Sequence, residues 1–128
     1  MKIVNVGIYV SDLEKVKEFF EHYFDAKIEA VLNDEASSYY SYILKLDEGA
    51  FIELMNKPTL VDDKKNPNRT GIAHINVNVD SRERFESIVD EFKKEGYVIQ
   101  YETYSADKTS GEIRAVTIED IIFEVSFG

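Results

Sequence analysis

The sequence contains no cysteine and no tryptophan, and it has only two prolines among its 128 residues. The absence of cysteine excludes a disulfide framework and thiolate chemistry. No apolar run approaches the length of about 20 residues that a transmembrane helix needs. The first residues lead directly into a predicted strand, without the apolar core of a signal peptide. We therefore expect a cytoplasmic protein that does not insert into membranes.

Positive charge is also scarce, because 15 lysines and arginines face 25 aspartates and glutamates, for a formal net charge of −10. Such a chain is repelled by the phosphates of nucleic acids and by anionic membranes, so neither is an expected partner. Apolar residues are plentiful at 44%, with eight phenylalanines and eight tyrosines. This composition is sufficient for the core of one compact domain, which we expect to span residues 1–128.

One segment of the sequence occurs twice in similar form. NVGIYVSDLE, which starts at Asn5, is matched by HINVNVDSRE, which starts at His74. Each copy later reaches a strand that contains a glutamate, Glu53 in FIELM and Glu124 in FEVS. The separation is 48 residues from Asn5 to Glu53 and 50 residues from His74 to Glu124. The chain is therefore predicted to consist of two similar modules.

Hydrophobic periodicity predicts the order βαβββ in both modules. Module one, residues 1–56, has expected strands at 3–10, 27–31, 39–46 and 50–55 and a helix at 12–24. The connection, residues 57–71, contains both prolines. Module two, residues 72–128, has expected strands at 72–79, 97–102, 112–118 and 121–127 and a helix that ends at Gly96.

Two local features complete this prediction. A capping box is expected at the start of each helix, formed by Ser11 with Glu14 and by Asp80 with Glu83. Residues 104–111 are rich in serine, threonine, aspartate and glycine, and we interpret them as a loop near the entrance of a site.

The alternation of side chains along each strand predicts where the four repeated polar residues point. Apolar neighbours on both sides of each one are expected to face the helix, so Asn5, Glu53, His74 and Glu124 are expected to face away from it. A single polar residue on that face is usually just solvated. Recurrence in both modules favours ligands to one ion instead. One histidine with two carboxylates suits a divalent metal such as Zn, Ni, Co, Mn or Fe(II).

With these motifs, and GIAHINV at the start of the second copy, the chain resembles the vicinal oxygen chelate superfamily, specifically its glyoxalase I branch. The resemblance implies an α+β fold in which two tandem βαβββ modules form a curved, partly open barrel. It implies that Asn5, Glu53, His74 and Glu124 bind the metal. The expected metal is Ni or Zn, with Co, Mn or Fe as alternatives. It also implies homodimers whose sites are shared between chains.

The implied reaction converts the hemithioacetal of methylglyoxal and a thiol to an S-lactoyl thioester through an enediolate, with Glu124 as the base. This would make the chain a lyase of methylglyoxal detoxification. Tyr9, Asn56 and Arg69 are candidate substrate contacts, and Lys57, Lys108 and Arg114 are further cations that could bind the thiol cosubstrate.

Two features depart from the pattern of that branch. Asn5 occupies a position where bacterial relatives usually have histidine, and the segment TIEDI, residues 117–121, replaces a turn that usually contains glycine. Two alternative functions therefore stay open. One is a metal-free module that sequesters a small molecule, as in bleomycin-resistance relatives, and the other is an epimerase of a coenzyme A thioester.

Overall fold

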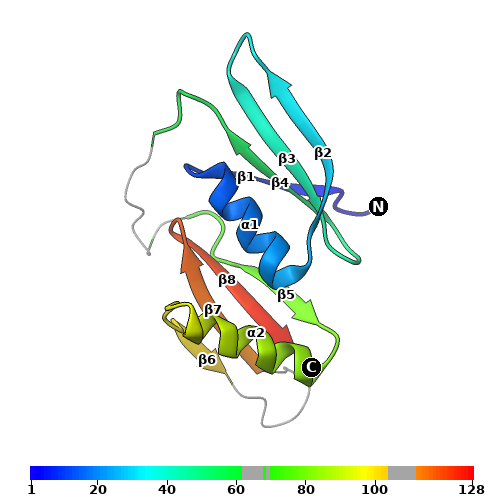
Figure 1. The fold of residues 1–128 in the computed structure, drawn as a ribbon, viewed down its shortest axis with the longest axis vertical. Coiled ribbons are helices and arrows are strands. Elements are labelled where there is room, and N and C mark those ends of the chain that lie inside the picture. The colour runs from blue at the N-terminus through cyan, green and yellow to red at the C-terminus, as the bar shows by residue number, and fades with distance from the viewer. Residues whose placement is uncertain (62–67, 69, 104–111) are drawn as a thin grey trace. The chain divides into compact units, whose positions relative to one another are not determined.

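The structure is a computed structural model that describes residues 1–61, 68, 70–103 and 112–128 (Figure 1). The chain divides into two compact units, Met1–Asp63 and Lys64–Gly128. Each unit contains one four-stranded sheet, which is not closed, and one helix, in the order βαβββ. The predicted fold class, α+β with two tandem βαβββ modules, is confirmed. The predicted loop 104–111, Arg69 and residues 62–67 of the predicted connection lie outside the described residues.

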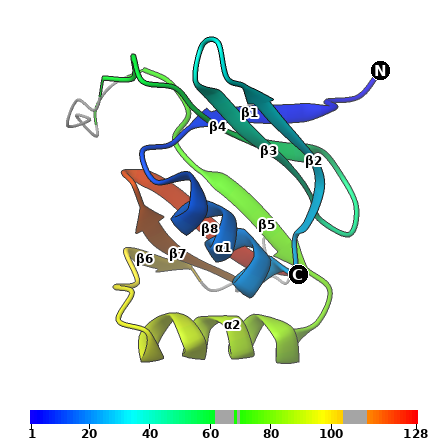
Figure 2. The same cartoon turned by 45° about the horizontal axis from the view of Figure 1, so that its top comes forward.

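The first unit consists of β1 (Asn5–Tyr9), α1 (Leu13–Phe24), β2 (Lys27–Asp34), β3 (Tyr39–Lys45) and β4 (Phe51–Asn56). The sheet order is β1-β4-β3-β2, in which β1 runs parallel to β4 and the other neighbours are antiparallel. Helix α1 packs on one face of this sheet, where it contacts β3 and β4. Figure 2 shows the four strands from a second direction. Its Val16 and Phe20 are fully buried, as are Leu44 and Leu54 of the sheet, so the core lies between the helix and this face.

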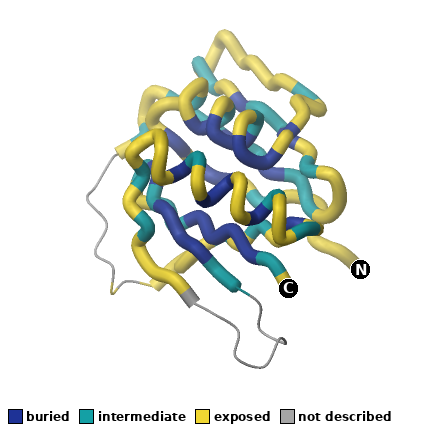
Figure 3. Tube along the Cα trace, turned by 60° about the horizontal axis from the view of Figure 1, so that its bottom comes forward, coloured by how far each residue is buried: buried dark blue, intermediate teal, exposed yellow. Residues whose placement is uncertain are grey.

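The second unit repeats this arrangement with β5 (Ile75–Val79), α2 (Arg82–Lys94), β6 (Tyr101–Thr103), β7 (Glu112–Ile118) and β8 (Ile121–Phe127). The sheet order is β5-β8-β7-β6, and only β5 and β8 are parallel. Phe85 and Phe92 of α2 are buried, together with Phe123 and Val125 of β8. In both helices the buried positions recur on one side (Figure 3), as the amphipathic pattern predicts.

The predicted capping boxes are wrong by one residue in both units. The N-cap of α1 is Asp12, whose Oδ1 accepts a hydrogen bond from the backbone N–H of Lys15 at 3.0 Å. The N-cap of α2 is Ser81, whose Oγ accepts from the backbone N–H of Arg84 at 3.1 Å. Glu14 instead accepts a hydrogen bond from the hydroxyl of Tyr42. Its carboxylate also lies 3.0 Å from the ammonium of Lys17.

Two strand lengths also differ from the prediction. Strand β2 continues to Asp34, because it pairs with β3 along its length as far as Tyr39. Strand β6 is only three residues long. Neither helix in the described part of the chain is long and apolar enough to cross a bilayer.

The hairpin between β7 and β8 closes with a two-residue turn. Glu119 and Asp120 both have positive φ, 50° and 62°, and Ile118 pairs with Ile121. Two successive left-handed residues match the right-handed twist of the strands, although neither residue is the usual glycine or asparagine. The turn sets a register in which Ala115 pairs with Glu124.

Candidate metal centre

In the second unit, His74 and Glu124 lie side by side. His74 immediately precedes β5, and its Nε2 is 3.4 Å from Oε1 of Glu124 on β8. Phe123 and Val125 are buried on the face covered by α2, so Glu124 points to the opposite face. The imidazole is about half exposed, whereas the carboxylate is buried.

Both oxygens of the Glu124 carboxylate accept hydrogen bonds. Asn76 Nδ2 donates to Oε1 at 3.0 Å, and the hydroxyl of Tyr101 donates to Oε2. Burial raises the pKa of Glu124, but these two hydrogen bonds and the nearby His74 lower it by more, so the net pKa lies below its usual range. Glu124 is therefore ionised at neutral pH and can act as a metal ligand or as a proton acceptor.

Polar side chains extend this network along β5 and β8. Asn78 Nδ2 donates to Ser126 Oγ at 3.1 Å, and Ser126 Oγ donates to Asn76 Oδ1 at 2.7 Å. The asparagine that holds Glu124 is thus fixed by a second residue. Asn76 was not among the predicted site residues, although strand alternation places it on the same face as Glu124.

In the first unit, Asn5 and Glu53 lie on neighbouring parallel strands, β1 and β4. Glu53 pairs with Gly7, two residues after Asn5, just as Glu124 pairs with Asn76, two residues after His74. The register therefore makes Asn5 and His74 equivalent positions of the two sheets. Glu53 lies between the buried Ile52 and Leu54 and points away from α1. Its Oε1 accepts a hydrogen bond of 3.2 Å from the hydroxyl of Tyr39. Tyr39 was also not among the predicted site residues.

The donor atoms of the second unit fit a divalent ion. Nitrogen and oxygen ligands lie about 2.0–2.2 Å from Zn²⁺ and similar ions, so two adjacent ligand atoms are about 3–3.5 Å apart. The 3.4 Å between His74 Nε2 and Glu124 Oε1 falls in this range. One imidazole and one ionised carboxylate are also the donor types that such ions bind. Within the first unit, Asn5 and Glu53 offer two oxygen donors on one face.

The predicted substrate contacts occupy different environments. Tyr9 is on the same face of its sheet as Glu53, is half exposed, and has the ammonium of Lys57 5.0 Å from its ring centre. The amide nitrogen of Asn56 donates to the backbone oxygens of Val10 and Ser11, at 2.6 and 3.3 Å. Asn56 therefore fastens the end of β1 to β4.

Arg114 does not face the polar side of its sheet. It is buried on the α2 side, where its guanidinium lies 5.4 Å from the ring centre of Phe85 and 3.5 Å from the carboxylate of Glu112. Strand alternation places it with the buried Val116, so the sequence pattern contained this information. Lys108, the other predicted cation of this unit, lies outside the described residues.

A separate cavity of about 510 Å³ lies within the first unit. Tyr40 and Tyr42 of β3 line it together with Asn56 and the first turn of α1. This pocket is on the helix side of the sheet, whereas Glu53 points to the other side.

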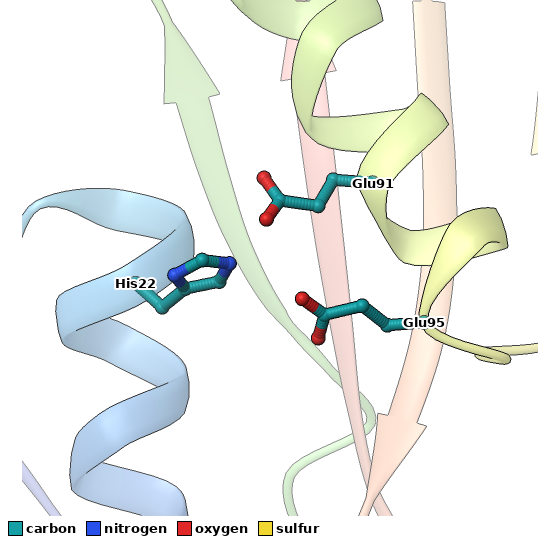
Figure 4. A group of neighbouring side chains, drawn as sticks. All are labelled: His22, Glu91 and Glu95. Atoms are coloured by element: carbon teal, nitrogen blue, oxygen red, sulfur yellow. The ribbon is translucent and has the colours of Figure 1, made fainter.

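Figure 4 shows His22 in the last turn of α1, Glu91 of α2, and Glu95, the C-cap residue of α2. His22 is exposed. Because the histidine belongs to the first unit and both glutamates to the second, no shared site is assigned to the three side chains.

Comparison with known proteins identifies a family. Residues 2–120 match the model of the glyoxalase/bleomycin resistance protein/dioxygenase superfamily. No curated protein sequence matches the chain significantly.

Three solved structures illustrate the similarity. A glyoxalase family protein from Bacillus cereus has a TM-score of 0.81 at 19% identity, with 99% of this chain and 93% of that chain covered. The trypanothione-dependent glyoxalase I of Leishmania major has a TM-score of 0.76 at 18% identity, with coverages of 99% and 86%. The fosfomycin resistance protein FosX of Listeria monocytogenes, complexed with Mn(II) and 1S,2S-dihydroxypropylphosphonic acid, has a TM-score of 0.72 at 17% identity, with coverages of 98% and 91%. At sequence identities of 17–19%, the similarity to these structures shows a shared fold and not a shared activity.

Proposed function

The chain belongs to the glyoxalase/bleomycin resistance protein/dioxygenase superfamily, and we propose that it is a metal-dependent enzyme that moves a proton beside a carbonyl group of a small-molecule substrate. The observation that carries this proposal is the 3.4 Å approach of His74 Nε2 to the ionised carboxylate of Glu124. In the proposal, Asn5 and Glu53 supply the remaining ligands, from the same chain or from the partner in a homodimer of this cytoplasmic protein.

The leading specific activity is that of glyoxalase I, acting on the hemithioacetal of methylglyoxal and a thiol. Glu124 accepts the proton from C1 and returns it to C2, so that the hemithioacetal carbon becomes the carbonyl of an S-lactoyl thioester. The reaction is an isomerisation: C1 is oxidised and C2 is reduced within the same molecule, so no external oxidant is needed. A divalent metal would polarise the substrate oxygens and stabilise the enediolate. The proposed metal is Ni or Zn, with Co, Mn or Fe as alternatives.

The residues around Glu124 suit this role in two ways. The carboxylate is ionised at neutral pH, as a general base must be. Its burial also keeps bulk water away from the transferred proton. Tyr9, with Lys57 beside its ring, is the proposed contact for the thiol portion of the substrate, and Arg69 is a further proposed contact.

One observation favours a second candidate, the metal-free sequestering module. Asn5 offers an amide oxygen where relatives in the glyoxalase I branch usually have imidazole, and amides are weaker ligands for Ni and Zn. A thioester epimerase is the third candidate, because it needs the same proton transfer beside a carbonyl. Only a substrate screen separates it from glyoxalase I.

The first experiment is metal loading of chelator-stripped protein with Ni, Zn, Co and Mn separately, followed by dialysis and measurement of metal per protomer. We expect close to one ion per chain, and loss of binding in His74→Ala and Glu124→Gln. The matched control is His22→Ala, which removes the only other histidine of the chain. Failure to retain any of the four ions would favour the sequestering module.

Protein that retains metal is then assayed for isomerisation of the hemithioacetal of methylglyoxal with glutathione. Formation of the S-lactoyl thioester, dependent on metal and lost in Glu124→Gln, is the expected result. Metal retention without isomerisation would contradict the glyoxalase I activity, and epimerisation of acyl coenzyme A thioesters would be tested next.

A further inference from the structure

Four residues of the second unit form one row across all four strands. Tyr101 of β6 pairs with Ala115 of β7, Ala115 pairs with Glu124 of β8, and Glu124 pairs with Asn76 of β5. Residues paired in register point to the same face of a sheet. The row therefore places a tyrosine, a small residue, a carboxylate and an amide next to one another.

Ala115 makes the contact between the outer members possible. Neighbouring strands are about 4.8 Å apart, so the backbones of Tyr101 and Glu124 are separated by about 10 Å. Their side chains meet above β7, where Ala115 is fully buried and contributes only a methyl group. A larger side chain at this position would occupy the space in which the hydroxyl of Tyr101 reaches the carboxylate.

We propose that Tyr101 is a positioning residue that, together with Asn76, holds the carboxylate of Glu124 from both sides and keeps Oε1 directed toward His74. The contacts that carry the proposal are the two donors on opposite oxygens, Asn76 on Oε1 and Tyr101 on Oε2. A carboxylate with one donor on each oxygen cannot rotate without breaking a hydrogen bond inside a buried environment. The metal-binding consequence of this role rests on the proposed function.

The first unit pairs the same residue types by a different route. There, the hydroxyl of Tyr39 donates to Oε1 of Glu53, and Tyr39 is on β3, which is next to the strand of the glutamate. Tyr101 is on β6, two strands away from Glu124. The two tyrosines therefore occupy non-equivalent positions of the repeated fold, so the pairing is not a simple consequence of the repeat.

The test is Tyr101→Phe, which removes the hydroxyl and keeps the ring. Residues that orient metal ligands typically contribute 10–100-fold to metal affinity, so we expect the dissociation constant to rise by about that factor in chelator-competition titrations. The matched control is Tyr97→Phe, which removes a hydroxyl from a ring of the same unit that packs against Phe92 of α2. An unchanged dissociation constant in Tyr101→Phe would overturn the proposal.

A second readout needs no metal and separates this proposal from the proposed function. In metal-free protein, NMR should show a downfield hydroxyl proton for Tyr101, protected from exchange, and a carboxyl ¹³C resonance of Glu124 that shifts in Tyr101→Phe. The hydroxyl proton should move in Glu124→Gln. If wild type retains no metal but these signals are present, the proposed function fails and the arrangement of Tyr101 and Glu124 stands. A Glu124 resonance that is insensitive to Tyr101→Phe would overturn it.

Discussion

Asn76 and Glu124 face each other on the parallel strands β5 and β8, and the amide nitrogen of Asn76 lies 3.0 Å from Oε1 of Glu124. The other end of the same amide accepts a hydrogen bond from Ser126. This orientation of Asn76 is thus fixed at both ends, with the N–H₂ group directed toward the carboxylate. The charge of Glu124 depends on that orientation.

Asn76→Asp should therefore destabilise the protein, because it replaces the donor with a second carboxylate beside a buried one. We expect a loss of about 1–3 kcal/mol in the free energy of unfolding at pH 7, measured by urea titration. Part of the loss should be recovered near pH 5, where one proton shared by the pair relieves the repulsion.

The matched control for this substitution is Asn78→Asp. Asn78 contacts the hydroxyl of Ser126 and not a carboxylate, so the new charge is not placed against a second one and the loss at pH 7 should be smaller. Equal losses for the two variants, with no recovery at lower pH, would show that the Asn76 contact does not govern the charge of Glu124.

The Tyr101 contact predicts a dependence of stability on alkaline pH. Burial raises the pKa of Tyr101, and so does its hydrogen bond to the Glu124 carboxylate. A tyrosine of the unfolded chain titrates near 10. Because the folded pKa is higher, the contribution of Tyr101 to stability is fully present below about pH 10 and is lost as the pH rises toward the folded pKa.

The measurement compares wild type with Tyr101→Phe in urea titrations between pH 8 and pH 11.5. The difference in the free energy of unfolding should stay constant up to about pH 9 and then shrink, because only wild type can release this proton on unfolding. All other tyrosines are common to both proteins. A difference that is independent of pH throughout this range would contradict the prediction.

The turn between β7 and β8 predicts a stabilising substitution. Asp120 has a φ of 62°, and the left-handed region costs residues with a side chain about 1 kcal/mol relative to glycine. Asp120→Gly should therefore raise the free energy of unfolding by about 0.5–1 kcal/mol. Asp47→Gly is the control, since Asp47 is in the turn before β4 and is not among the residues with positive φ. Stabilisation by Asp47→Gly and not by Asp120→Gly would refute this account of the turn.

The start of each helix gives a fourth prediction. Asp12 and Ser81 are the N-caps, so Asp12→Ala and Ser81→Ala should each cost about 0.5–2 kcal/mol of stability. Ser11→Ala and Asp80→Ala are the neighbouring controls and should cost less. Thermal unfolding of the four variants is sufficient to rank their stabilities. A larger loss of stability in Ser11→Ala or Asp80→Ala would support the N-caps predicted from the sequence.

These caps also show what the sequence could and could not predict. Ser-Asp at 11–12 and Asp-Ser at 80–81 each offer two residues of nearly equal capping strength, so local preference does not choose between them. In the first unit, the carboxylate of Glu14 contacts Tyr42 and Lys17 and therefore does not complete a capping box with Ser11. The repeated pattern, by contrast, predicted the order of the elements, because hydrophobic periodicity directly reflects which face is buried.

The candidate site, too, was predictable from the sequence only in part. Strand alternation alone places Glu53 and Glu124 on the face opposite the helices, and the repeat makes Asn5 equivalent to His74. The contact from Tyr101 was not predictable, because it depends on the register of a three-residue strand against β7. Nothing in the local sequence specifies that register.

Asn5 gives the sharpest test of the proposed metal centre. If residue 5 binds the metal, Asn5→His should raise the affinity for Ni or Zn at least tenfold, because imidazole binds these ions better than an amide oxygen does. The measurement is chelator competition on metal-free protein, with His74→Asn as the reciprocal variant, which should lower the affinity. Asn78→His is the matched control, since it adds an imidazole beside Ser126. An equal gain in metal affinity from Asn5→His and Asn78→His would mean that any added histidine binds metal. Residue 5 would then not be a specific ligand of the site.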